Sequence, residues 1–129
     1  MGKTLKLMIL LALLVLLILL GACSTESFGQ LHAGGESVIN SVCKNCHGVN
    51  GIGGFAPSLD NRLGCTFQNA KQVYDKMRSD MPRNKPGSLS TMEYRQALSY
   101  VLLENGLANE GDIFEVGTLS DIKLPECPS

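Results

Sequence analysis

Two cysteines three residues apart are followed at once by a histidine, in the run Cys43-Lys44-Asn45-Cys46-His47. In a helix, residues i and i+3 lie on one face, so both thiols can reach the same edge of a flat ligand. The pattern is typical of c-type haem attachment, in which the two sulfurs bind the porphyrin covalently. We therefore predict one covalent haem c held by Cys43 and Cys46, with His47 as an axial ligand of its iron.

A cysteine pair of this kind has two other interpretations, a thioredoxin-like dithiol and half of a zinc site. A redox dithiol is typically found beside a βαβ pattern, but the residues around this pair are helical in pattern and rich in glycine. A structural zinc ion needs a second pair of ligands at short range, and the sequence offers none. Both alternatives are therefore weaker than haem attachment.

The N-terminus has the pattern of an export signal. Two lysines precede an unbroken apolar run at residues 7–20, which is shorter than the roughly 20 residues that a membrane span needs. The run ends in a segment, residues 20–23, that resembles a bacterial lipobox. We expect residues 1–22 to be removed as a lipoprotein signal peptide and Cys23 to carry acyl chains that hold the protein on a membrane. A plain signal peptide or an uncleaved anchor helix is the alternative.

Export places the chain in an oxidising compartment, where its five cysteines can be divided by role. Cys23 is assigned to lipid and the motif pair to haem, which leaves Cys65 and Cys127. Exported chains usually oxidise such a pair, so we expect a disulfide, with two free thiols as the alternative. The bond would tie the C-terminal tail to the segment that follows the haem-binding loop.

The distribution of charge argues against a nucleic-acid partner and suggests a charged redox protein as partner. Removal of residues 1–22 changes the formal charge from −1 to −3, because two of the eleven basic residues and none of the twelve acidic ones are lost. A mildly acidic chain lacks the concentrated basic face that nucleic acid requires. Five basic residues nevertheless gather at residues 71–85, and we expect them to steer an oppositely charged redox partner. An ordinary solvated surface is the alternative.

Three segments have helical patterns. The first has apolar residues at positions 38, 39 and 42, begins near residues 34–35 and leads into the cysteine motif. The second has i, i+3, i+4, i+7 spacing over residues 70–77. The third opens with a capping box at residues 90–93 and stops at residues 105–106.

No strand pattern competes with these helices anywhere in the sequence. We expect an all-α fold in which three main helices surround the haem, in a domain of residues 33–129 that follows a polar tether at residues 23–32. The tail beyond Gly106 is expected to pack back as an irregular wrap or one short helical turn. So short a chain buries a modest fraction of its surface, and the porphyrin would form much of the core.

Iron bound by one histidine has an open position, and Met77, Met81, Met92 and His32 could fill it. Met81 stands before Pro82, which favours an extended backbone and ends the second helix, so its thioether can be presented from a loop. Met77 belongs to an apolar helical stripe, Met92 to the first turn of the third helix, and His32 to the tether. We predict Met81 as the second axial ligand, with an empty position as the alternative.

The second ligand decides the expected function. A His/Met pair raises the reduction potential and leaves no position for oxygen, peroxide or substrate, so the centre would carry single electrons and not be an enzyme. If Met81 does not bind the iron, the alternative is a five-coordinate haem sensor or a peroxidase-like protein. A third possibility is a structural role as a subunit that docks a dehydrogenase. The carbonyl of Pro57 is our candidate to accept the second ring N–H of His47.

The order of these residues resembles that of the class I cytochromes c. The likeness runs from about Gly35 to the C-terminal tail, through the cysteine motif, residues 57–59 and the Met81-Pro82 pair. It implies the roles given above to the two cysteines, the histidine, the methionine and the proline carbonyl. It also implies that the first and last helices cross, with residues 35–42 against Tyr100. Ile39 departs from the pattern, because the family often has an aromatic residue there.

A narrower likeness rests on residues 81–90, Tyr94, residues 100–102 and 105–106, and residues 119–125. These segments are similar to those of the cytochrome subunits of quinoprotein alcohol dehydrogenases and of sulfite or sulfane dehydrogenases. The resemblance implies a haem that passes electrons from a dehydrogenase to an oxidase or another cytochrome. We therefore expect a lipid-anchored monohaem cytochrome c on the periplasmic side of a bacterial cytoplasmic or outer membrane, where it links a dehydrogenase or a respiratory complex to a later acceptor.

Overall fold

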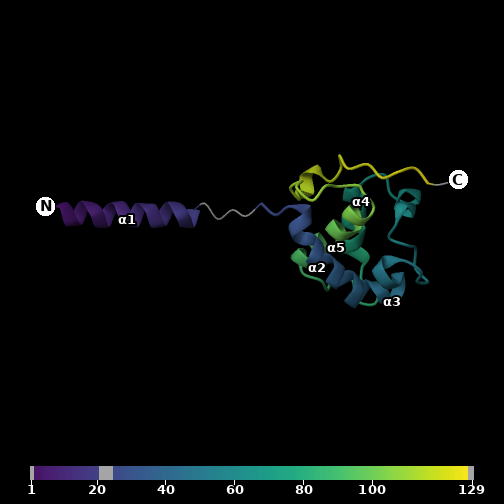
Figure 1. Ribbon diagram of the computed structural model, residues 1–129. Coiled ribbons are helices and arrows are strands. Elements are labelled where there is room, and N and C mark those ends of the chain that lie inside the picture. Colours follow the sequence, from purple (N-terminus) through teal and green to yellow (C-terminus); the bar gives the residue numbers. More distant parts are fainter. Residues whose placement is uncertain (1, 21–24, 128–129) are drawn as a thin grey trace.

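The computed structural model describes residues 2–20 and 25–127, and in these ranges the regular structure is helical (Figure 1). Its α-helices are α1 (Lys3–Leu20), α2 (Phe28–Val38), α3 (Lys44–His47), α4 (Ala70–Asp80) and α5 (Thr91–Glu104). A π-helical turn, η1 (Ile39–Cys43), joins α2 to α3, and the 3-10 segments are η2 (Val49–Gly51), η3 (Asn61–Cys65) and η4 (Val116–Thr118). The predicted all-α fold is confirmed.

Helix α1 covers most of the predicted export signal and stands apart from the other helices (Figure 1). Within the two described ranges, no helix is long and apolar enough to span a membrane. Cys23, the predicted site of lipid attachment, lies outside the described residues.

Helix α2 begins earlier than we expected. Ser27 and Gln30 form a capping box, in which the Ser27 N–H donates to Gln30 Oε1 at 2.9 Å and the Gln30 N–H donates to Ser27 Oγ at 3.3 Å. Phe28 and Leu31 are each only 2% exposed and belong to the core. The tether predicted at residues 23–32 therefore ends at Ser27, and residues 28–32 are part of the folded domain.

Helices α2 and α5 cross in close contact. A Cβ atom at Gly35 would collide with the backbone carbonyl of Gln96 and the Cβ of Tyr100, so glycine is what allows the two backbones to approach. The crossing confirms the contact expected between residues 35–42 and Tyr100. Ile39 is fully buried beside it, so an aliphatic side chain fills the place where the family often has an aromatic ring.

The second and third predicted helices are confirmed as α4 and α5. Asn69 caps α4, and its Oδ1 accepts from the Gln72 N–H at 3.1 Å. The predicted capping box of α5 is present, since Glu93 Oε2 accepts from the Ser90 N–H at 2.7 Å and Ser90 Oγ accepts from the Glu93 N–H at 3.2 Å. The bond from the Ser90 backbone lowers the pKa of the Glu93 carboxyl.

The buried apolar residues form two clusters. The larger one packs α2, α4 and α5 against the segment that follows α5, and its buried members are Phe28, Leu31, Ala70, Val73, Tyr74, Tyr94, Leu98, Leu102, Phe114 and Leu119. The smaller one adjoins the cysteine motif, with buried members Val38, Ile39, Leu63, Ala97, Tyr100 and Val101. Cys43, Leu59, Phe67, Met77 and Leu89 pack on this smaller cluster and stay partly exposed, and we call these five residues the apolar border.

The C-terminal tail packs back on the domain as an irregular segment with one short 3-10 turn, as expected. It contacts the start of α4, where the Ala70 N–H donates to the Ile122 carbonyl at 3.0 Å and the Leu124 N–H donates to the Gln68 carbonyl at 3.1 Å. The structure contains the disulfide expected between Cys65 and Cys127, which are 62 residues apart. The tail is therefore fixed both covalently and by backbone hydrogen bonds.

The helix crossing yields a stability prediction. Replacing Gly35 with alanine forces α2 and α5 apart, and we expect a loss of about 3 kcal/mol in the free energy of unfolding of the haem-loaded protein, measured by denaturant titration. Gly117→Ala is the control, because no described atom lies within 4 Å of the added Cβ, and it should change stability by less than about 0.5 kcal/mol. Equal effects of the two substitutions would contradict the argument.

The disulfide yields a second stability prediction. A cross-link that closes a 62-residue loop restricts the unfolded chain, so the double variant Cys65→Ala/Cys127→Ala should lose about 4 kcal/mol of unfolding free energy. Treating the unmodified protein with a reductant should produce the same shift, since thioether bonds resist reduction. A denaturation midpoint that neither treatment moves would show that the tail's hydrogen bonds suffice.

Candidate haem site

The two motif cysteines lie on one continuous helical segment. Cys43 ends the π-helical turn η1 and Cys46 lies in α3, and both are free thiols that are partly buried. Burial, followed by the charge of Cys46, raises the pKa of the Cys43 thiol to about 11. This thiol therefore carries its proton at neutral pH. Neither thiol belongs to a group of three or more metal-binding side chains among the described residues.

His47 follows at the end of α3, and its ring is held by one hydrogen bond. Its Nδ1 lies 2.7 Å from the backbone oxygen of Pro57, the partner named from the sequence. A carbonyl can only accept, so Nδ1 carries a proton, and in the neutral ring this leaves the lone pair on Nε2. The structure thus fixes both the orientation and the tautomer that a metal-binding imidazole needs.

The loop after the motif returns Pro57 to the histidine. The Gly54 N–H donates to the His47 carbonyl at 3.1 Å, and the Ala56 N–H donates to the Cys46 carbonyl at 2.9 Å. A Cβ at Gly54 would collide with that Cys46 carbonyl, so only glycine lets the loop pass so close. The glycine-rich loop is therefore the means by which the chain orients His47.

Met81 is the C-cap of α4, with φ −117° and ψ 149°. This is the extended backbone expected for a residue before proline. Tyr94, to which sequence analysis assigned no role at the site, donates its hydroxyl hydrogen to the Met81 carbonyl at 2.7 Å. The signal that could have found this role is the polar atom itself, because a buried tyrosine hydroxyl usually has a partner.

The other candidates for the second ligand are engaged elsewhere or exposed. Met77 lies within α4 and packs on both buried clusters, and Met92 is 38% exposed. His32 was expected in the tether, and this was wrong. It lies in α2, where its Nε2 is 2.8 Å from Glu104 Oε1 and its ring stacks on Tyr100 at 5.1 Å between centroids.

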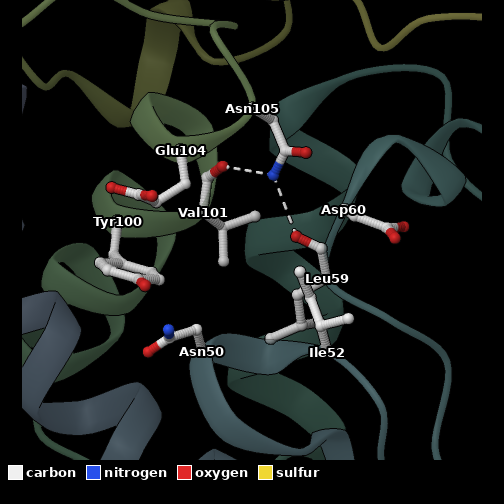
Figure 2. Close-up of a pocket in the computed structure, with 8 residues that line it drawn as sticks. All are labelled: Asn50, Ile52, Leu59, Asp60, Tyr100, Val101, Glu104 and Asn105. Carbon is white, nitrogen blue, oxygen red and sulfur yellow. Dashed lines mark hydrogen bonds between the residues drawn. The ribbon is translucent and has the colours of Figure 1, made fainter.

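A small cavity lies between the loop that follows His47 and the end of α5. It encloses about 200 Å³ and is lined by Asn50, Ile52, Leu59, Asp60, Tyr100, Val101, Glu104 and Asn105 (Figure 2). None of the motif residues lines it, and ligand sites usually enclose about 300 Å³ or more. Figure 2 shows that hydrogen bonds hold one side of the cavity together, because the Asn105 amide donates to the carbonyls of Leu59 at 3.0 Å and Val101 at 2.7 Å. Sequence analysis treated Asn105 only as a helix stop.

The basic cluster at residues 71–85 is less positive than the sequence analysis suggested. Its five basic residues are interleaved with Asp75 and Asp80, which leaves a net charge of +3. Lys71 Nζ lies 2.7 Å from Asp75 Oδ2, and Lys76 forms an ion pair with Asp80 whose hydrogen bond lowers the pKa of that carboxyl. Arg78 lies over the Tyr74 ring, 5.8 Å from its centroid.

The residues fit a covalent haem c. Two free thiols three residues apart precede a histidine whose Nε2 is available to a metal. The apolar border, which includes Cys43 itself, leaves five apolar side chains partly uncovered, as expected of residues that line a flat apolar ligand.

Comparisons with known proteins agree with this assignment. A family model described as cytochrome c oxidase, cbb3-type, subunit III, matches residues 30–101, which contain the cysteine motif, Pro57 and Met81. No curated protein sequence matched the chain.

One solved structure is similar in fold. It is the sulfane dehydrogenase SoxCD from Paracoccus pantotrophus, with a TM-score of 0.60 and 21% sequence identity. The match covers 81% of this chain and 62% of that chain, so this chain spans less than two thirds of the length of the structure it resembles. At this level of identity the similarity concerns the fold. The family match covers more than half of the sequence and includes every residue of the haem-binding motif, so the chain belongs to the cytochrome c family described as cbb3-type cytochrome c oxidase subunit III, and it is a monohaem c-type cytochrome.

Proposed function

We propose that this protein carries single electrons between redox proteins, with His47 and Met81 as the two axial ligands. The haem supplies a one-electron couple whose potential is set by its ligands and surroundings. The observation that carries the proposal is the 2.7 Å hydrogen bond from His47 Nδ1 to the Pro57 carbonyl. It directs Nε2 to a metal and fixes a rigid ligand, which suits a centre that changes charge without binding a substrate.

Met81 is the second ligand in this proposal for two reasons. Its backbone is extended at the end of α4, so its side chain starts from a loop and not from a packed helical face. Met77 lies within α4 and packs on both buried clusters, and His32 contacts Glu104. A thioether opposite an imidazole closes both axial positions and excludes small ligands.

We place the electron-transfer face beside the motif. The loop that orients His47 exposes three apolar side chains, with Val49 68%, Ile52 55% and Phe55 86% exposed. We call these three residues the apolar patch. Its loop is hydrogen-bonded to the backbone of Cys46 and His47, so a protein that covers the patch also approaches the cofactor edge. Exposed apolar groups of this kind mark sites of protein contact.

The partners in this proposal are a dehydrogenase or a respiratory complex as donor, and an oxidase or another cytochrome as acceptor. Arg83 and Lys85, both exposed and next to Met81 in the chain, would add positive charge that orients an acidic partner. Cleavage before Cys23 and lipid on that cysteine would hold the domain on the periplasmic side of a bacterial membrane.

Ligation by Met81 can be tested by spectroscopy. The oxidised protein should show the weak near-infrared band of sulfur bound to iron, and Met81→Ala should abolish the band and lower the reduction potential. The reduced variant should also bind carbon monoxide, which the unmodified protein should resist. Met77→Ala, the control, should keep the band. An unmodified protein that lacks the band and binds carbon monoxide would instead favour the five-coordinate sensor or peroxidase-like protein.

The transfer face can be tested without a known partner, because two copies of a cytochrome exchange electrons with each other. Phe55→Asp places a charge on the apolar patch and should slow self-exchange, measured by NMR line broadening, by about tenfold. Val116→Asp makes the same charge change on η4, at the opposite end of the domain from α3 (Figure 1), and should have little effect. Equal slowing by both variants would mean that the electron-transfer face lies elsewhere.

A further inference from the structure

We infer that the Tyr94 hydroxyl positions the loop that carries Met81 and thereby sets how firmly the methionine is held at the iron. The inference rests on the proposed ligation by Met81. It makes Tyr94 a positioning residue, since it acts through the backbone of the ligand and not on the metal.

The first step is the geometry of Met81. Its N–H donates to the Met77 carbonyl at 3.1 Å, which continues the hydrogen bonding of α4, and its carbonyl accepts from the Tyr94 hydroxyl at 2.7 Å. Both backbone polar groups of the residue are therefore bonded, one to α4 and one to α5. With the backbone fixed in this way, only the side-chain torsions remain to aim the sulfur.

The second step is the rigidity of the anchor. Tyr94 is 3% exposed and belongs to the larger apolar cluster. It lies in the first turn of α5, where its N–H donates to the Ser90 carbonyl at 3.1 Å. The capping box of Ser90 and Glu93 stabilises this same turn. The hydroxyl is therefore presented from a fixed point.

The third step concerns the other hydrogen bonds of the loop at residues 81–89. Its backbone bonds are internal, such as Lys85 N–H to the Pro82 carbonyl at 2.8 Å and Gly87 N–H to the Met81 carbonyl at 3.4 Å. These bonds keep the shape of the loop, and within the described chain the backbone of residues 81–89 forms a backbone–backbone hydrogen bond to a helix only through the Met81 N–H, which reaches α4 and not α5. In the described part of the chain, the bond from Tyr94 is the one side-chain hydrogen bond that joins residues 81–89 to α5. Its loss should loosen the loop without unfolding it.

The chain offers a matched control. Tyr74 is also buried, at 1% exposure, but its hydroxyl has no hydrogen-bond partner among the described residues. Tyr94→Phe and Tyr74→Phe thus remove the same atom from two buried rings, and only the first removal breaks a hydrogen bond. Both changes keep the shape of the core, so both variants should fold and take up haem.

The experiment compares these two variants with the unmodified haem-loaded protein. Cyanide binds the oxidised protein only after the methionine leaves, so Tyr94→Phe should bind cyanide about tenfold faster, the factor expected for one lost hydrogen bond. Tyr74→Phe should behave like the unmodified protein. Leu102→Val, which shortens a fully buried side chain of α5, reports the effect of general destabilisation and should not raise the cyanide rate.

The outcomes separate the inference from the proposed function. A methionine band present in all variants, with cyanide rates equal in Tyr94→Phe and the unmodified protein, would overturn the inference and leave ligation by Met81 intact. A faster cyanide rate in Leu102→Val equal to that of Tyr94→Phe would also overturn it, because the effect would then be global. Absence of the band from the unmodified protein would overturn the ligation, and the inference with it.

Discussion

The close crossing of α2 and α5 at Gly35 is the contact on which the haem site depends. Helix α2 continues through η1 into α3, so its direction fixes where Cys43, Cys46 and His47 lie. Helix α5 and its C-cap hold two loops, one through Asn105, which bonds Leu59, and one through Tyr94, which bonds Met81. A change in the angle between these two helices would therefore move the cysteines relative to both loops at once.

Both proposed ligands follow the same physical design. In each case the chain leaves a helix just where the ligand lies: His47 ends α3, and Met81 follows the last residue of α4. In each case a backbone carbonyl forms the critical bond, accepting from His47 Nδ1 at Pro57 and from the Tyr94 hydroxyl at Met81. Each proposed ligand residue is thus held by a hydrogen bond between a side chain and a backbone carbonyl.

Much of this arrangement could be predicted from the sequence, because it depends on local chemistry. The caps of α5, the extended Met81 and the cysteine motif each follow from a few neighbouring residues. The predicted start of the first helix, near residues 34–35, was wrong because Gly34 and Gly35 suggested a break. Helix α2 tolerates both glycines and uses Gly35 for contact with α5. The capping box of Ser27 and Gln30 was present in the sequence and would have given the correct start.

Long-range pairing was harder to predict. Nothing near His32 in the sequence indicates its partner Glu104, which is 72 residues away. The bond between Tyr94 and Met81 likewise needs the packing of α4 against α5 before the two groups can meet. The ion pairs of the basic cluster are local and could have been predicted, because Asp75 and Asp80 each lie four residues after a lysine.

The early start of α2 limits how far the domain could travel from a lipid on Cys23. Three residues separate that cysteine from the Ser27 cap, and a fully extended chain of this length reaches about 14 Å. So short a tether would keep the domain close to the lipid headgroups and would stop it from diffusing to distant soluble proteins. Electron donors and acceptors would then have to come to the bilayer surface themselves.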